Sequence, residues 1–484
     1  MTAWYVQSTP VPTSAGPRDG TQNTPYLTLA EVEAASAPGD EIIVLSPLPG
    51  APPLDGGISL KSGQHLRGIE SAKGPPQITN TDPARRGGDA VTLADNSKVS
   101  GLDILGAAGH AIVGRNVSGA VVTGNQIHAG NLSDLTSVGT GATAGLGIIE
   151  FPKGIVAFFH DASNVTARAN TISDNEISGI QVEGQALKRL GGAGIALHAR
   201  GNSQALLLTS ENRISDLGPG FQRSGILIDA QGDATIDLEI DDTRVANAFG
   251  SSDGIILVAQ HRSSITASVR RYQYVGGTPD QGLGNNGLEV ATYYGADWLT
   301  GGSTPEWHSA QTKLLIEESD MQGAAGFGVV VFNIFGKPSS STVLDFGGGE
   351  LGGRGANRIH NNGLELPSPL EVYVVQHDLN MANTWWGVDR TGSAKVEETD
   401  GGWQLKSKFA FNCPGEPDQL QGLVEGTGTT AWSVFCQTYR ADVCTAGNDS
   451  TDCCDPSTDS AQCKISPAAS SLASLPALPN DPRP

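Results

Sequence analysis

The first 412 residues contain no cysteine, and the 484-residue chain has no apolar run that approaches the roughly 20 residues of a membrane span. The main body therefore lacks a disulfide framework, and no segment predicts a transmembrane helix. Charged residues are also scarce at 17%, and aromatic residues at 6%. Glycine is plentiful, with 63 residues, and this composition favours a turn-rich β protein over a helical one.

Basic residues are in short supply relative to acidic ones. The chain has 30 Lys and Arg against 51 Asp and Glu, which gives a formal net charge of −21. Such a field repels phosphate backbones, so we expect no nucleic-acid partner. Neutral substrates remain open, as do acidic substrates that a cation bridges.

All the cysteines lie in the C-terminal part of the chain, at Cys413, Cys436, Cys444, Cys453, Cys454 and Cys463. This clustering predicts a small disulfide-stapled module made in an oxidising compartment. Zinc binding is the alternative, although the paired CxxC spacing is missing. The run "GNDSTDCCDPSTDS" carries oxygen ligands that suit calcium, or it forms a disulfide-held loop.

The N-terminus, "MTAWYVQSTP", has no signal-peptide core. Because the cysteines indicate an oxidising compartment, we expect a secreted or cell-surface protein whose signal peptide has been removed. The C-terminal module is a candidate for cell-surface attachment.

The body of the chain repeats with a period of roughly 30 to 40 residues. The clearest copies are "GIVAFFHDASNVTARANTIS" from 154, "GIALHARGNSQALLLTSENRIS" from 194, "GILIDAQGDATIDLEIDDTRV" from 225 and "GIILVAQHRSSITASVRRYQYV" from 254. Each copy has a glycine, an alternating apolar strand, a polar corner, a second alternating strand and a turn. Three short strands per period suit a parallel β-helix, whereas leucine-rich repeats and β-propellers fit the pattern less well.

Asparagine recurs in these copies within an Asn-x-Ile pattern. We expect Asn125, Asn170, Asn212 and Asn357 to mark equivalent corners of successive coils, where the amide bonds main-chain groups and the residue tolerates left-handed geometry. His360, three positions after Asn357, is also expected at a corner.

The chain resembles the right-handed parallel β-helix proteins of the pectate-lyase-like superfamily. The resemblance rests on "GTQNTPYLTLAEV", which would open a capping helix, on "APGDEIIVL" as the first strand and on "NTWWGVD" where the coils end. It covers roughly residues 4 to 390 and implies an all-β, right-handed parallel β-helix with an N-terminal cap, to which the clustered cysteines add a small Cys-rich C-terminal appendage. The expected divisions are a cap at 1–40, the β-helix at 41–390, the Cys-rich module at 391–465 and a disordered tail at 466–484. The polygalacturonase and pectate-lyase signatures are missing, so the resemblance fixes no activity.

Aligning the copies on their glycines predicts which side chains meet. Positions one and three, such as Ile195 and Leu197, are apolar and face the core, so positions two and four face outward. Position four contains, in successive coils, Phe158, His198, Asp229, Val258 and Ala291. Position six contains His160, Arg200, Gln231, Gln260 and Tyr293.

This register places His198 beside Asp229, Arg200 beside Gln231, and Glu289 two coils away. Such a set could move protons in glycan cleavage, with Asp229 and Glu289 as carboxylates, His198 as proton shuttle and Arg200 as substrate anchor. The alternative is a surface ion pair of little consequence.

Aromatic residues are concentrated in "TYYGADWLTGGSTPEWHSAQ" from 292. Tyr293, Tyr294, Trp298 and Trp307 are candidate platforms for sugar rings, together with Gln231 and Gln260 as polar contacts. Packing of this loop on the coils is the alternative.

These patterns predict a secreted, carbohydrate-active protein that cleaves a polysaccharide or oligosaccharide by hydrolysis or β-elimination on an outer sheet face. A non-catalytic solenoid that binds glycan or mediates adhesion is the alternative. These residues require no cofactor. If the substrate is acidic, calcium is the cation that would bridge it to the protein. The sequence leaves the identity of any metal ligand unknown.

Overall fold

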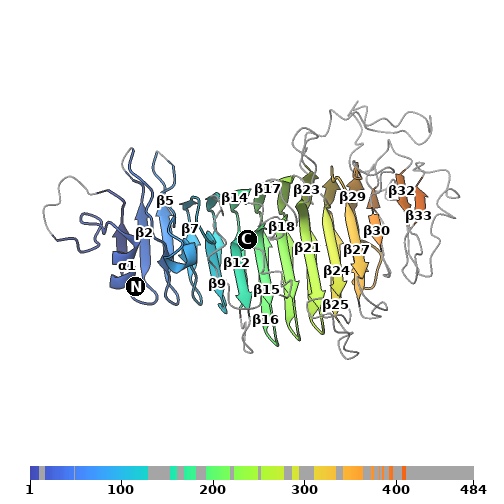
Figure 1. Ribbon diagram of the computed structural model, residues 1–484, viewed down its shortest axis with the longest axis horizontal. Coiled ribbons are helices and arrows are strands. Elements are labelled where there is room, and N and C mark those ends of the chain that lie inside the picture. The colour runs from blue at the N-terminus through green and yellow to red at the C-terminus, as the bar shows by residue number, and fades with distance from the viewer. Residues whose placement is uncertain are drawn as a thin grey trace.

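The computed structural model describes residues 1–9, 17–47, 50–72, 74–128, 153–160, 168–180, 192–217, 223–248, 252–276, 286–293, 310–333, 342–363, 372–374, 381, 384–385, 392–395 and 406–409. Within these ranges the chain forms three long parallel sheets that stack coil upon coil (Figure 1). The expected right-handed parallel β-helix is therefore confirmed as the fold.

The three sheets are named A, B and C, and from β4 to β30 the chain visits them in that order. Sheet A contains β1 (Ala3–Val6), β2 (Glu41–Leu45), β4 (His65–Ile69), β7 (Lys98–Ser100), β10 (Val121–Thr123), β13 (Asn170–Ser173), β16 (Gln204–Ser210), β19 (Thr235–Asp241), β22 (Ser264–Arg270), β25 (Gln311–Glu317) and β28 (Val343–Asp345). Sheet B contains β5 (Gln77–Ile78), β8 (Asp103–Ile104), β11 (Gln126–His128), β14 (Glu176–Ile180), β17 (Arg213–Leu217), β20 (Arg244–Ala248), β23 (Gln273–Gly276), β26 (Asp320–Gln322), β29 (Asn357–His360) and β31 (Thr384–Trp385). Sheet C contains β3 (Ile58–Ser59), β6 (Val91–Thr92), β9 (Ile112–Arg115), β12 (Lys153–His160), β15 (Gly192–Ala199), β18 (Arg223–Ala230), β21 (Ser252–Gln260), β24 (Leu288–Tyr293), β27 (Val329–Asn333) and β30 (Val372–Val374).

Two helical segments and one antiparallel pair complete the described structure. The 3-10 helix η1 spans Arg86–Gly88, and β32 (Gly392–Lys395) pairs antiparallel with β33 (Lys406–Phe409). Helix α1 spans Leu29–Ala35 and begins with a capping box between Thr28 and Glu31. No helix among the described residues is long and apolar enough to cross a membrane.

The N-terminal part differs in one respect from the expectation. The expected helix is present, and its Leu29 and Val32 belong to the main core. However, "APGDEIIVL" supplies the second strand, because β1 precedes it and pairs with it in parallel. Whether α1 acts as a cap stays a prediction, and the six cysteines lie outside the described residues.

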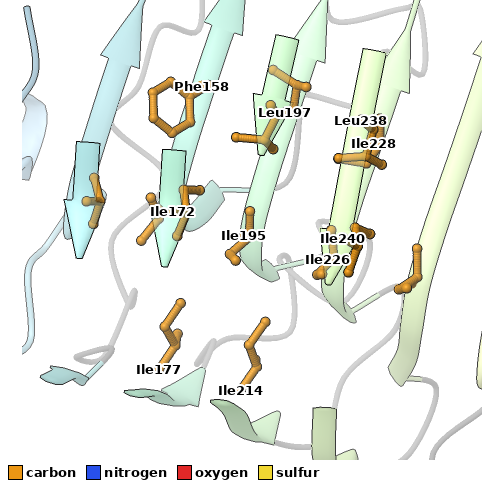
Figure 2. Close-up of a cluster of buried hydrophobic side chains, with 14 of the residues drawn as sticks. Phe158, Ile172, Ile177, Ile195, Leu197, Ile214, Ile226, Ile228, Leu238 and Ile240 are labelled. Atoms are coloured by element: carbon orange, nitrogen blue, oxygen red, sulfur yellow. The ribbon is translucent and has the colours of Figure 1, made fainter. Parts of the chain in front are cut away.

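One continuous apolar core runs along the inside of the coils (Figure 2). Strand alternation supplies it, since Ile195 and Leu197 of β15 and Ile226 and Ile228 of β18 all point inward and are buried. Phe158 belongs to the same core. Each coil therefore buries its apolar face against its neighbours, as expected for a solenoid.

The repeated glycines are explained by close contact between adjacent coils. A Cβ placed on Gly225 would lie 2.8 Å from the carbonyl oxygen of Gly254, and one on Gly254 would lie 2.3 Å from that of Gly287. A side chain at these positions would collide with the next coil, so glycine recurs once per coil.

The corner between sheets A and B carries a ladder of asparagine amides. The Nδ2 group of Asn125 donates to Oδ1 of Asn175 at 3.0 Å, and the Nδ2 group of Asn175 donates to Oδ1 of Asn212 at 3.0 Å. Further along the same corner, Oδ1 of Asn357 accepts a bond from the main-chain N–H of Ser319. The same amides also satisfy main-chain groups at the corner, as when Nδ2 of Asn175 donates to the carbonyl oxygen of Val122.

Asn170 was predicted to be equivalent to these residues, and that prediction is wrong. Asn170 begins β13 in sheet A, and the residue that stacks between Asn125 and Asn212 is Asn175. The left-handed residue is also not the asparagine but the one before it, as in Glu211 with φ of 56°. His360 is likewise not a corner residue, because it lies in β29 and contacts Asp320 at 3.1 Å.

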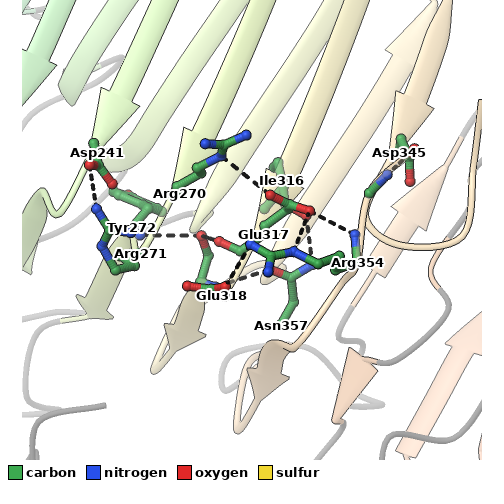
Figure 3. A network of polar contacts seen from close by, with 12 residues as sticks. Asp241, Arg270, Arg271, Tyr272, Ile316, Glu317, Glu318, Asp345, Arg354 and Asn357 are labelled. Carbon is green, nitrogen blue, oxygen red and sulfur yellow. Dashed lines mark hydrogen bonds and ion pairs between the residues drawn. The ribbon is translucent and has the colours of Figure 1, made fainter. Parts of the chain in front are cut away.

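Charged side chains near this corner pair with one another in the later coils (Figure 3). Arg271 bonds Asp241, and Arg354 lies 3.3 Å from Glu318. Arg270 lies 3.3 Å from Glu317, whose carboxylate also accepts a bond from the main-chain N–H of Arg354.

Candidate site on the outer face of sheet C

Two rows of side chains cross the outer face of sheet C. The first row is mainly apolar and contains Val113, Ala157, Ala196, Leu227, Ile256 and Glu289. The second row contains Arg115, Phe159, His198, Asp229, Val258 and Ala291. The apolar members of the first row form a second hydrophobic cluster, separate from the main core. This separation confirms that the rows face away from the solenoid interior.

His198 and Asp229 are register partners, as predicted. Nδ1 of His198 lies 3.5 Å from Oδ2 of Asp229. The alternative of a solvated surface pair is wrong, because His198 is 1% exposed and Asp229 is 5% exposed. The pair therefore faces outward yet is covered.

Asp229 is held by two amide groups. Nε2 of Gln231 donates to its Oδ2 at 3.0 Å, and Nε2 of Gln260 donates to its Oδ1 at 3.0 Å. Both glutamines were predicted as substrate contacts, and in the structure they orient the carboxylate. The main-chain N–H of Gln231 bonds the carbonyl of Ala199, which sets Gln231 beside the half-buried Arg200 as predicted.

His198 lies in an environment that disfavours its charged form. Burial lowers the pKa of His198, and the neighbouring Asp229 opposes this shift only in part. The Phe159 ring stacks on the imidazole of His198 with a centroid distance of 5.1 Å. The guanidinium of Arg115 lies over the Phe159 ring, 5.1 Å from its centroid.

In the β12 coil the predicted strand register differs from the observed register by one residue. Phe159, and not Phe158, pairs with His198, while Phe158 points into the core. His160 pairs with Ala199 rather than with Arg200. The coils from His198 onward match the predicted register.

Glu289 occupies an unusual position in the apolar row. Its register partners are Ile256 on one side and Val330 on the other. Burial raises the pKa of Glu289 to about 7, although a hydrogen bond from Nδ2 of Asn286 at 3.3 Å partly offsets this effect. The main-chain N–H of Asn286 in turn donates to Oδ1 of Asp253 in β21 at 2.8 Å. A carboxyl with this pKa can give or take a proton near neutral pH.

A second histidine–carboxylate pair on this face was not predicted. Nδ1 of His110 lies 2.7 Å from Oδ1 of Asp89, and both side chains are buried. Burial alone would raise the pKa of Asp89, but the bond and the charge of His110 lower it overall. The His110 ring meets Phe159 edge-on at 5.6 Å. Asp89 and His110 belong to weak copies with short strands, so the repeat alignment gave no signal for them.

Several predicted site residues lie outside the described residues. These are Tyr294, Trp298 and Trp307, and for Tyr293 only the main chain is described, paired with Gln260 as predicted. Within the described ranges, no group of three His, Cys, Asp or Glu side chains is arranged to hold a metal ion.

The fold defines the class of protein, a right-handed parallel β-helix, and comparisons with known proteins agree at that level. Residues 69–268 match a family model described as a right handed beta helix region. No curated protein matches the chain. A solved structure titled rhamnogalacturonan lyase is similar at 10% identity with a TM-score of 0.28, over 79% of this chain and 87% of that chain. A likeness at this level carries no functional argument, so function must be argued from the side chains of sheet C.

Proposed function

We propose that this protein is a carbohydrate-active enzyme that cleaves a polysaccharide at the outer face of sheet C, with Glu289 as the principal proton-transferring group. One observation carries the proposal: a carboxyl group with a pKa near 7 stands in an apolar row, next to the row that holds the Asp229–His198 pair. A carboxyl whose pKa burial perturbs in this way is a candidate for a functional group.

Hydrolysis is the reaction that this arrangement favours. Protonated Glu289 would donate its proton to the glycosidic oxygen as the bond to the anomeric carbon breaks. A water molecule would attack that carbon and give its proton to Asp229, which the two glutamine amides and His198 hold in place. The proton of Glu289 thus ends on the leaving sugar, and the proton of the attacking water ends on Asp229.

The separation of the two carboxylates bears on stereochemistry. Asp229 and Glu289 lie two strands apart, and they are also offset by two residues along the strand direction. Strand spacing and rise per residue together place their backbones about 12 Å apart. This distance is too wide for a retaining pair and compatible with an inverting one once the side chains reach inward. We therefore expect inversion of the anomeric centre.

Other parts of the proposal come from the sequence. Arg200 would anchor the substrate, and Tyr293, Tyr294, Trp298 and Trp307 would stack on sugar rings. The protein would act outside the cell or at its surface. If the substrate is acidic, calcium would bridge it to the negatively charged protein, and chelation by EDTA would then reduce activity.

A panel of neutral and acidic polysaccharides tests the proposal. We expect new reducing ends without absorbance near 235 nm, while absorbance at that wavelength would indicate β-elimination with Glu289 or His198 as base. The low exposure of His198 and Asp229 favours a second candidate, a non-catalytic glycan-binding solenoid. Retention of a glycan with neither product would support that candidate and contradict catalysis.

A further inference from the structure

A groove of about 510 Å³ lies on the outer face of sheet B, beside the corner with sheet A. One side of the groove is a row of exposed or half-buried register partners on successive coils: Gln126, Glu176, Arg213, Arg244 and Gln273. Four steps of strand spacing make this row about 19 Å long. The groove is therefore long enough to follow an extended chain along the solenoid axis.

The two arginines of this row lie side by side, and the other register partner of Arg213 is Glu176. Arg213 and Arg244 are direct partners in adjacent strands, and like charges in this position repel. Within the described part of the chain, neither guanidinium forms an ion pair or a side-chain hydrogen bond, and Nε of Arg244 is buried without a partner. Apart from that buried Nε, we expect these guanidinium donors to be the groups of this row that a ligand would meet.

The rim of the groove repeats this pattern with the opposite sign. Asp174, Glu211 and Asp242 precede the corner residues of three successive coils and line the same groove. Arg271 bonds Asp241, which directly precedes Asp242, and in a later coil Arg354 pairs with Glu318 (Figure 3). Within the described residues Arg213 and Arg244 have no such ion pair, and departures from favourable pairing concentrate at functional sites.

We propose that this groove binds a neutral polysaccharide, as a second site distinct from the face of sheet C. An anionic chain would meet four carboxylates, including Glu176, and a cationic chain would meet the two guanidiniums. The hydroxyl groups of a neutral sugar can accept from the guanidinium forks and donate to the carboxylates and amide oxygens. The groove lining contains no aromatic side chain, so binding depends on hydrogen bonds and is of modest affinity.

The test measures polysaccharide binding by affinity electrophoresis and calorimetry, using the full chain and a panel of soluble neutral and acidic polysaccharides. The variant Arg213→Gln/Arg244→Gln should weaken binding of a neutral polysaccharide at least tenfold. Arg213→Lys/Arg244→Lys, which keeps the charge but loses the fork, should also weaken it. Arg270→Gln/Arg354→Gln changes the charge equally outside the groove and should bind like wild type.

Binding at the groove should persist at high salt, because hydrogen bonds to a neutral ligand are screened little. Any cleavage of short oligosaccharides should be unchanged in the Arg213 and Arg244 variants, which separates this site from that of sheet C. The proposal is overturned if no neutral polysaccharide binds, if only acidic ones bind, or if the groove variants bind as tightly as wild type.

Discussion

At the scale of single residues, the outer face of sheet C shows that an outward direction does not imply exposure. His198 and Asp229 point away from the core but are almost fully buried. Their polar atoms therefore interact in a less polar setting than a surface pair would, and removing one partner has a larger effect.

Asp229→Ala should lower the free energy of unfolding by about 1–3 kcal/mol, because the amides of Gln231 and Gln260 lose their acceptor. A solvated surface pair would instead contribute almost nothing to the free energy of unfolding. Chemical denaturation provides the measurement, with Asp237→Ala, at an exposed position on sheet A, as the matched control. Equal stability of the two variants would contradict the buried contacts.

Glu289 gives the protein a defined pH dependence. Its folded pKa of about 7 lies above the ordinary 4.5, so the native state binds more protons between these values. Stability should therefore fall as pH rises from about 4.5 to about 7, by at most about 3 kcal/mol, and then level off.

Glu289→Gln should remove this dependence and be more stable than wild type above pH 7. Thermal melts from pH 4 to 9 measure the difference, with Glu239→Gln, an exposed glutamate of sheet A, as control. If wild type and the Glu289 variant melt in parallel across the range, the carboxyl is not buried as described.

At the scale of strands and corners, the asparagine ladder explains why the Asn-x-Ile pattern recurs. Asn175 receives bonds from the main-chain and side-chain N–H groups of Asn125 and donates to Asn212, to the carbonyl of Val122 and to that of Ser173. One amide therefore joins three coils.

Asn175→Ala should cost about 1–3 kcal/mol or more, since it leaves buried main-chain groups without partners. Asn202→Ala, at an exposed turn, should change stability by less than about 0.5 kcal/mol. Denaturant titration of both variants measures this, and a small effect at Asn175 would mean that water replaces the ladder.

The sequence predicted the elements and most of their register, with instructive exceptions. Glycine recurs at equivalent positions because adjacent coils approach closely at Gly225 and Gly254. Alignment of the copies on these glycines therefore predicted correctly that His198 and Asp229 are register partners. The Asn-x-Ile pattern misassigned Asn170, because strands on both sides of the corner begin with the same alternation. Burial of His198 could not be predicted, since pairing specifies neighbours and not what covers them.

At the scale of the whole molecule, the net charge of −21 limits the choice of partner. Mobility-shift assays with double-stranded DNA and with RNA in about 50 mM salt should show no complex, because the field repels phosphates. A retarded band at this low ionic strength would contradict the exclusion of nucleic acid.

The solenoid also places the outer faces of sheets B and C on different sides of the molecule. Sheets B and C look in different directions from one core, so a binding groove and a reaction site can coexist without sharing side chains. The chemistry proposed for sheet C then depends on Glu289, and the binding proposed for sheet B depends on Arg213 and Arg244.

The rate of polysaccharide cleavage as a function of pH, for wild type and Glu289→Gln, tests the central claim most directly. We expect wild-type cleavage to decline as pH rises through about 7, where Glu289 loses its proton, and the variant to be slower by about 100-fold or more. Cleavage by the variant at the wild-type rate, or no product from any polysaccharide with wild type, would contradict the account.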